Sequence, residues 1–487
     1  MDEFHVDLLI IGGGINGAGV AADAAGRGLS VLLCEKDDLA NHTSSASSKL
    51  IHGGLRYLEQ YDFKLVRHAL KEREILMNMA PHLVHPLSFV LPHDQHLRPK
   101  WMIRAGLFLY DHLASRKTLA SSKQLKLPKV VEGAPLKDKF TFGFRYSDCY
   151  TDDARLVVTN ALSAKANGAT ILTRTECKKL ARVGSHWQAE LLDKNTRKKI
   201  KVDAKGVVNA TGAWVSKVLN AIAGENSNAG VKLVKGSHFV VPKFYEGDHA
   251  YILQNPDDRI VFVIPYWNDY ALIGTTDVSY NGSPNTLKIS KDEISYLLKT
   301  VNTYFKKQMK ADDICWSYAG ARALYDDKSP NPSKISRDYH LELDDREQSL
   351  PILSVFGGKI TTFRTLAEDV LDKLKPYYPQ MKSSWTASSQ LPGGDLGGKS
   401  YQEFCEDLKR VYAKLPSAML NRMAYHYGSN VFKVLGYAQS TEDLGDCVAG
   451  DLFQKEEEYL RNNEWAQSME DILWRRTKVG LICPRSI

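Results

Sequence analysis

An apolar segment opens the chain and is followed at once by closely spaced glycines. Val6 and residues 8–11 form the apolar run, and Gly12, Gly14 and Gly17 complete a G-x-G-x-x-G pattern before an alanine-rich segment. Such a run predicts a buried parallel strand, and the glycines predict a tight turn into a helix whose N-terminus faces a phosphate. A second strand follows and ends at Glu35, where a carboxylate would accept hydrogen bonds from a ribose. This order predicts a dinucleotide-binding βαβ unit; the alternative is a glycine-rich turn without a ligand.

The remaining pattern predicts further strands and helices along the chain. Helical periodicity covers 63–79, 152–167 and 361–374, and strands are predicted over 170–172, 187–192, 199–202 and 352–356. Between residues 230 and 350, β-branched and aromatic segments bounded by proline and glycine predict an antiparallel sheet. Residues 81–150 look irregular and suit a lobe that faces a substrate. Residues 400–480 have helical periodicity, so we expect a separate helical cap after the turn-rich linker 391–395.

Two more glycine-containing segments stand where a predicted strand meets a helix. Residues 206–214 include Asn209-Ala-Thr-Gly212 and resemble the second nucleotide-contacting strand end of two-dinucleotide-binding flavoproteins. The alternative for this segment is a strand followed by a helix cap. The second segment, Gly357-Gly358-Lys359, offers backbone N–H groups to an anion or to an electron-rich ring edge.

Composition narrows the classes of protein. A chain of 487 residues is too long to fold around one hydrophobic core, so two or three domains are expected. No stretch reaches the roughly 18 apolar residues of a membrane span, and no signal peptide is visible, so we expect a cytosolic chain. The net charge of +7 allows an anionic substrate or lipid, whereas no basic block or motif spacing supports nucleic acid. The seven cysteines lack a C-x-x-C pair and predict reduced thiols, and no metal-binding spacing is present.

A set of cationic side chains lies near the predicted strand ends and glycine turns. Its members are Lys49, His52, Arg56, Lys235, His238, Arg322, Arg337 and Lys359. Arginine and lysine that converge would bind a small phosphate-bearing or carboxylate-bearing substrate. The alternative for each is a solvated surface charge or a structural ion pair.

Several motifs together resemble the FAD-dependent glycerol-3-phosphate dehydrogenases. They are TSSASSKLIHGGLRYL at 43–58, YSDC at 146–149, DDARL at 152–156, KGSH at 235–238, IGTTD at 273–277 and FGGKITT at 356–362. The resemblance extends from residue 6 to about residue 478 and is closest to the aerobic, membrane-associated bacterial enzymes. One departure is visible at 320–327, where Ala321 and Ala323 replace the expected valine and proline and could loosen a turn.

The resemblance implies a fold and a reaction. The expected fold is α/β, with an FAD domain like those of glutathione reductase and D-amino-acid oxidase, an antiparallel substrate domain and an all-helical cap. The expected domains are 1–80 with 150–220 and 350–385 for FAD, 81–149 with 221–349 for substrate, and 390–487 for the cap. The implied reaction oxidises sn-glycerol 3-phosphate to dihydroxyacetone phosphate, reduces FAD and passes the electrons to a membrane quinone.

The resemblance also implies the site residues. The FAD site would contain Gly12, Gly14, Asn16, Gly17, Glu35, Ser44, Ser45, Ser48, Lys49, Ala210, Gly212, Gly358, Lys359 and Thr361. Arg56, Tyr57, His238, Thr275, Arg322, Arg337 and Lys359 would lie near the substrate or flavin.

An alcohol oxidation needs a phosphate-binding cation, a proton acceptor and stabilisation of a developing alkoxide. Arg322 and Arg337 are the candidates for the phosphate or the alkoxide, since arginine is too basic to accept a proton. His238 is the candidate proton acceptor, and Lys359 would favour an anionic reduced flavin. The alternative for His238 is a histidine that is hydrogen-bonded within its strand.

A quinone acceptor requires contact with a membrane surface. The helix predicted over 361–374 is amphipathic and ends with Lys373 and Lys375, followed by Tyr377 and Tyr378. It could lie at a membrane interface, or it could pack on a sheet. We expect peripheral attachment to anionic lipid on the cytoplasmic side of the inner membrane, and a homodimer is possible.

Two other functions are compatible with the same motifs. One is an oxidase that returns the electrons to oxygen as hydrogen peroxide. The other is a flavin-binding protein without catalysis, against which the retained Arg322, Arg337 and Lys359 argue.

Overall fold

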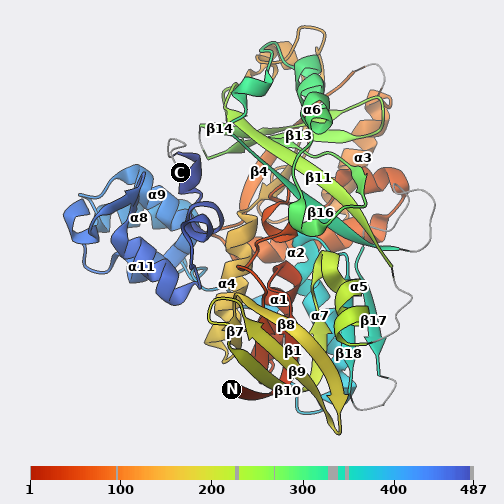
Figure 1. Ribbon diagram of the computed structural model, residues 1–487. Coiled ribbons are helices and arrows are strands. Elements are labelled where there is room, and N and C mark those ends of the chain that lie inside the picture. The colour runs from red at the N-terminus through yellow and green to blue at the C-terminus, as the bar shows by residue number, and fades with distance from the viewer. Residues whose placement is uncertain are drawn as a thin grey trace.

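The fold consists of two β-sheets that face each other and a helical cap at one end. The computed structural model describes residues 2–94, 97–224, 230–267, 269–326, 338–345 and 350–482. Figure 1 shows the first sheet below, the second sheet above, and the cap on the left.

The first sheet contains the nucleotide-binding unit predicted from the sequence. Its strands run in the order β17-β18-β10-β1-β2-β7, and β8 and β9 extend it as an antiparallel pair joined to β10. The bounds are β1 Asp2–Ile11, β2 Val31–Cys34, β7 Thr170–Leu172, β8 Thr175–Val183, β9 His186–Asp193, β10 Lys199–Asn209, β17 His340–Asp344 and β18 Ile352–Phe356. β1 pairs in parallel with both β2 and β10, and alternate side chains of β1 pack into two different apolar clusters, so Leu8, Leu9 and Ile10 are fully buried.

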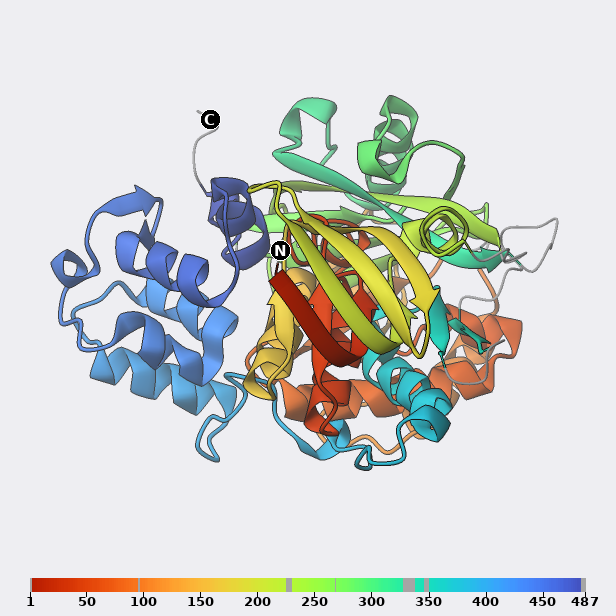
Figure 2. The same cartoon turned by 60° about the horizontal axis from the view of Figure 1, so that its bottom comes forward.

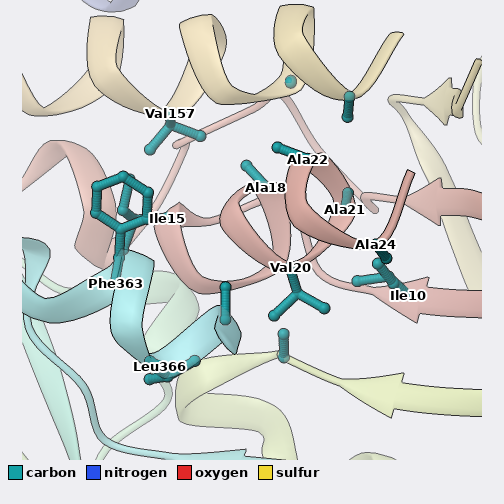
Figure 3. Packing of buried hydrophobic residues seen from close by; sticks show 14 of the residues in the cluster. Ile10, Ile15, Ala18, Val20, Ala21, Ala22, Ala24, Val157, Phe363 and Leu366 are labelled. Carbon is teal, nitrogen blue, oxygen red and sulfur yellow. The ribbon is translucent and has the colours of Figure 1, made fainter. Parts of the chain in front are cut away.

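Three helices cover one face of this sheet. They are α1 (Ile15–Gly26), α4 (Asp153–Ala166) and α7 (Phe363–Leu374). The small side chains of α1 allow a close approach on both sides: Figure 3 shows Ala18 and Ala22 facing Val157 of α4, and Phe363 and Leu366 of α7 on the other side.

The apolar side of α7 belongs to this core. Phe363, Leu366, Val370, Leu371 and Leu374 are buried, although their spacing is also that of a helix at a membrane interface. The proposed membrane role of residues 361–374 is therefore wrong for the apolar face. The alternative, an amphipathic helix that packs on a sheet, is confirmed.

The second sheet faces the first, and a large cavity lies between the two sheets. Its order is β15-β11-β14-β13-β12-β4-β6-β3, with β16 also paired to β11 and β5 to β6. The bounds are β3 Leu50–Ile51, β4 His85–Pro92, β5 Lys123–Leu125, β6 Gly143–Tyr150, β11 Gly230–Pro242, β12 Ala250–Gln254, β13 Ile260–Tyr266, β14 Tyr270–Gly274, β15 Val278–Tyr280 and β16 Trp316–Asp326. Three helices pack against it: α2 (Phe63–Met79), α3 (Lys100–His112) and α6 (Lys291–Tyr304).

Two expectations about this region are wrong. Residues 81–150 are not irregular: they contain β4, β6 and α3, and prolines at both ends of β4 hid its strand pattern. Residues 320–326 form strand rather than a turn, because Ala323 keeps a backbone N–H and pairs with Leu233 in register with β11.

The cap contains helices α8 (Tyr401–Val411), α9 (Ser417–Tyr427), α10 (Val431–Leu435) and α11 (Gln454–Asn463) around its own apolar core. It also contains a short hairpin of β19 (Cys447–Ala449) and β20 (Leu452–Phe453), so the expected helical cap is confirmed but is not purely helical. Figure 2 shows the cap beside α4, on the opposite side of the molecule from α3. The domain boundaries stay a prediction, and β3 and β17 each lie in the sheet of the neighbouring expected domain.

Buried ion pairs attach the cap to the first domain. Arg155 of α4 pairs with Glu464, and Arg476 Nη2 lies 2.8 Å from Asp38 Oδ1. All four residues are almost inaccessible to water, so each charge depends on its partner.

Histidines at the same junction provide a test in acid. Burial lowers the pKa of His82 to about 3 and that of His85 to about 4, while burial with Arg155, Arg422 and Lys478 lowers that of His426. Below the ordinary histidine pKa of roughly 6.5, the unfolded chain takes up protons that the folded chain does not. We therefore expect the melting temperature to fall between pH 7 and pH 5, where few carboxylates titrate. His82→Gln should reduce the slope; a melting temperature that is flat over this range would contradict the assignment.

Candidate functional site

The two sheets enclose one large cavity of about 840 Å³. Its walls come from the carboxyl ends of β1, β2, β10 and β18, from the loop 40–48, and from β11, β13 and β16 of the second sheet. Ligands of open parallel sheets bind outside the carboxyl ends of the strands, so this is the expected place for a cofactor.

Glycines allow the backbone segments at one end of the cavity to come together. A Cβ atom added to Gly12 would lie 2.6 Å from the Ala210 carbonyl oxygen, and Gly12 has a φ of +114°. A Cβ added to Gly17 would lie 1.9 Å from the Gly12 carbonyl oxygen, so α1 packs directly on the turn before it. The N-terminus of α1 therefore faces the cavity with its first N–H groups, as a pyrophosphate requires.

Glu35 stands at the end of β2 beside this turn. Its Oε2 atom accepts a hydrogen bond from the Gly13 N–H at 2.7 Å, and its Oε1 atom accepts from the Asp37 N–H at 2.8 Å. Burial raises the pKa of Glu35, and these two hydrogen bonds oppose that rise. The carboxylate lines the cavity in a fixed orientation, which suits a ribose diol.

The loop before β3 and the second glycine turn close the other side. Ser44 Oγ accepts from the Ile15 N–H at 3.0 Å, and Asn16 Nδ2 donates to the Gly357 carbonyl at 3.1 Å. A Cβ added to Gly358 would lie 2.8 Å from the Asn16 side-chain amide, and the φ of +98° at this position also favours glycine. Asn16 Oδ1 is buried and has no hydrogen-bond partner among the described residues. A bound group with an N–H or O–H donor would satisfy this atom, so the site fits a cofactor that carries a polar ring or hydroxyl groups.

The cavity end beneath the second sheet is cationic. Arg322 Nη1 lies 3.1 Å from Asp277 Oδ1, and its Nη2 donates to Thr275 Oγ1 at 3.4 Å. The Lys359 ammonium lies 4.1 Å from the centre of the Tyr57 ring. The Arg322 side chain is held in place yet open to a ligand, with 32% of its surface exposed.

His238 lies in β11 between this cationic end and the loop. Its Nε2 atom is 2.9 Å from Ser48 Oγ, and its ring stacks on Tyr318 with the centroids 5.0 Å apart. Burial lowers the pKa of His238 well below its ordinary value, and the nearby Lys49 and Arg322 add to this. The imidazole is therefore neutral at neutral pH. Its Nδ1 atom is buried without a partner within the described part of the chain.

The structure brings most of the residues expected at the site to the walls of this cavity. They are Gly12, Gly14, Asn16, Glu35, Ser44, Ser48, Arg56, Tyr57, Ala210, Gly212, His238, Thr275, Arg322, Gly358, Lys359 and Thr361.

Three expected cofactor residues do not line it. Gly17 packs on Gly12, Ser45 binds the His42 carbonyl, and Lys49 Nζ lies 2.7 Å from Asp153 Oδ1 in a buried ion pair. Lys49 therefore fulfils the alternative of a structural charge. Arg337 lies outside the described residues.

Other cavity residues were missed by the sequence analysis. Asp277 holds Arg322, although it stands in the motif 273–277 that supported the resemblance. Trp214 lies at the nucleotide end, where its ring contacts His42 at 4.6 Å and Lys36 at 3.6 Å. Phe262 gives no chemical signal in the sequence, because an aromatic residue in a strand is usually core.

Two groups of side chains in the described residues have the proximity of metal ligands: Glu3 with His5 and Asp203, and Glu35 with Asp37 and His42. In the second group Asp37 Oδ2 already pairs with His42 at 2.9 Å and Oδ1 with Lys194 at 2.7 Å. Hydrogen bonds and ion pairs explain this group without a metal ion.

Three features of the site define the class of protein as a dinucleotide-dependent α/β oxidoreductase. They are a helix N-terminus surrounded by glycines, an acid at the end of the second strand, and a cationic pocket under an antiparallel sheet. Comparison with known protein families supports this class. Residues 7–362 match the family described as FAD dependent oxidoreductase, and residues 384–486 match the C-terminal domain of alpha-glycerophosphate oxidase.

Individual relatives narrow the class. The chain is 52% identical to a glycerol-3-phosphate dehydrogenase of Pseudomonas aeruginosa, over 98% of this chain and 92% of that protein. It is 49% identical to a D-erythritol 1-phosphate dehydrogenase of Brucella abortus, over 97% and 94%. The crystal structure of a glycerol-3-phosphate dehydrogenase from Bacillus halodurans with FAD has a TM-score of 0.78 and 27% identity, covering 97% of this chain and 86% of the other. The chain belongs to the FAD-dependent oxidoreductases, in the glycerol-3-phosphate dehydrogenase group.

The glycine contact predicts how FAD is lost. Gly12→Ala would force a methyl group against the Ala210 carbonyl at a positive φ, so we expect colourless protein without retained FAD. Gly168→Ala is the matched control, because Gly168 also has a positive φ, +94°, but nothing within 4 Å of an added Cβ. The measurement is the flavin absorbance per chain after purification. Full FAD content in Gly12→Ala would contradict the proposed cradle.

Proposed function

We propose that the chain oxidises sn-glycerol 3-phosphate to dihydroxyacetone phosphate and transfers the electrons to a membrane quinone. The observation that carries the proposal is the single cavity in which the glycine cradle and the cationic end with Arg322, Lys359 and His238 meet. The names of the relatives support glycerol 3-phosphate as the substrate.

The cationic end would bind and orient the phosphorylated alcohol. Arg322 presents a planar guanidinium whose orientation is set by Asp277 and Thr275, so it would pair with a phosphate or a developing alkoxide oxygen. Arg56 and Lys359 line the same cavity and add positive charge. FAD, when bound, supplies the hydride acceptor for the hydrogen on substrate C2.

His238 would take the proton of the C2 hydroxyl at Nε2, the nitrogen that contacts Ser48. A neutral imidazole has the lone pair that this requires. Burial and two cations make the free histidine a weak base, and the negative phosphate of a bound substrate would offset those cations.

A second substrate has a specific observation in its favour. The Brucella relative is named for D-erythritol 1-phosphate and is nearly as similar as the Pseudomonas relative. The same phosphate-binding end would serve both polyol phosphates. We favour glycerol 3-phosphate, in accord with the motifs of the sequence.

Anaerobic reduction of the bound flavin tests the reaction. We expect the yellow colour to bleach with sn-glycerol 3-phosphate, and more slowly with D-erythritol 1-phosphate. Arg322→Met should raise the substrate concentration needed by at least about tenfold, since a charged hydrogen bond contributes roughly 1.5–3 kcal/mol. Lys232→Met, at an ion pair with Asp326 outside the cavity, is the control. Flavin that stays oxidised with both substrates would refute the dehydrogenase function and the oxidase function alike.

The electron acceptor separates the remaining alternatives. A quinone-linked enzyme should reoxidise quickly with a soluble quinone and slowly with air. Rapid formation of hydrogen peroxide without quinone would favour the oxidase, for which the family match of residues 384–486 is the specific observation.

We also propose peripheral attachment to the cytoplasmic side of the inner membrane. Because the apolar face of α7 is buried, we assign the membrane contact to α3 instead. No helix in the described part of the chain is long and apolar enough to span a bilayer. Trp101 and Phe108 on α3 are 70% and 57% exposed. Tyr61, shortly before α2, and Phe63, the first residue of α2, are exposed as well. Exposed aromatic residues beside the cations Lys100 and Arg104 suit the headgroup region of anionic lipid.

Vesicle binding tests this face. We expect Trp101→Ser with Phe108→Ser to lower cosedimentation with anionic vesicles at least about tenfold, because each large apolar side chain contributes roughly 1.5–3 kcal/mol. Tyr437→Ser removes a 98% exposed aromatic residue from the cap and serves as the matched control. Unchanged binding of the α3 double variant would contradict the assignment.

A further inference from the structure

We propose that the cap segment, residues 474–478, positions His238 for proton transfer, with Trp474 and Lys478 as the positioning residues. The inference rests on the proposed function, in which His238 accepts a proton. Two chains of contacts lead from this segment to the two sides of the imidazole.

The first chain is aromatic. Trp474 stacks on Trp316 with centroids 4.7 Å apart and planes 20° apart, and Trp316 contacts Tyr318 at 5.0 Å. Tyr318 in turn stacks on His238 at 5.0 Å with planes 18° apart. Trp474 thus supports, through two rings of β16, the face of the imidazole on which Tyr318 lies.

The second chain is charged and buried. Lys478 Nζ lies 2.9 Å from Asp152 Oδ2, and the adjacent Asp153 holds Lys49 Nζ at 2.7 Å. Asp153 Oδ2 also accepts from the Ser47 hydroxyl at 2.7 Å and from its N–H at 3.1 Å. Ser48, the next residue, contacts His238 Nε2 at 2.9 Å.

The two chains meet at Ser47. Tyr318 donates its hydroxyl hydrogen bond to the Ser47 carbonyl at 2.7 Å, while Asp153 binds the other polar atoms of the same residue. The position of Ser48, and with it the contact to His238 Nε2, therefore depends on both chains. Lys478, Asp152, Asp153 and Lys49 are each at most 4% exposed, so water cannot replace a lost partner.

Attachment of the cap does not explain these contacts. Arg155 with Glu464 and Arg476 with Asp38 already join the cap to the first domain without touching β11, β16 or Ser48. Segment 474–478 adds contacts that end at the imidazole. The cationic and polar groups facing His238 are Lys49, Arg322, Ser48 and Tyr318, and the two chains place three of these four.

Trp474→Leu and Lys478→Met test the proposal in the full-length protein with FAD. The measured quantity is the rate of anaerobic flavin reduction by saturating sn-glycerol 3-phosphate from pH 6 to pH 9, with FAD content and melting temperature recorded in parallel. We expect at least about a tenfold lower rate and a pH dependence shifted towards that of His238→Gln, because proton transfer contributes about 10²–10⁴-fold. Trp474→Phe and Lys478→Arg should restore the wild-type pH dependence.

Trp465→Leu is the matched control. Trp465 is a cap tryptophan that faces Lys165 of α4 at 5.2 Å. Among the described residues, it takes part in neither chain of contacts that leads to His238. It should lower the melting temperature without changing the pH dependence. A rate and pH dependence for Trp474→Leu and Lys478→Met equal to those of Trp465→Leu would overturn the inference.

If Lys478→Met does not fold, Trp474→Leu against Trp474→Phe decides alone, because Trp474 leaves no buried charge behind. A wild-type flavin that is not reduced overturns the proposed function and the inference together. A wild-type flavin that is reduced, with unaffected variants, overturns the inference only.

Discussion

The close approach of three backbone segments at Gly12 is the constraint on which the rest of the structure depends. The Gly12 carbonyl lies where a side chain of Gly17 would be, and Gly12 itself lies against the carbonyl of Ala210. This contact fixes the start of α1 between the ends of β1 and β10, and so determines where a pyrophosphate can bind. The glycine turn 357–358 makes a similar close contact at the end of β18, where the Asn16 side chain occupies the space that a side chain of Gly358 would need.

Much of this arrangement could be predicted because local patterns and tertiary contacts agree. The first strand, helix and second strand have strong, uninterrupted signals, and the helix predicted over 63–79 begins and ends where α2 does. Most site residues could be found because they stand in short motifs, beside glycines that the backbone requires. The cationic end formed because those motifs return to one edge from distant parts of the chain.

What could not be predicted depends on which partner a pattern meets. The spacing of apolar residues in α7 is the same for a sheet below and a membrane below, and only burial of Phe363 and Leu371 decides between them. Trp101 and Phe108 fall in the lobe predicted to be irregular, yet they lie in helix α3 with their aromatic rings exposed. Lys49 looked like a cofactor ligand because it stands among true cavity residues, but its partner Asp153 is 104 positions away. No local signal reveals such a pair.

The central claim is that one cavity holds FAD and a phosphorylated secondary alcohol so that hydrogen leaves C2 for the flavin. Stopped-flow reduction of the flavin under anaerobic conditions with sn-glycerol 3-phosphate, unlabelled and deuterated at C2, tests it most directly. We expect complete reduction with a primary isotope effect on its rate, because the C2–H bond breaks in that step. Flavin that stays oxidised, or a reduction rate indifferent to C2 deuteration when chemistry is made limiting, would contradict it.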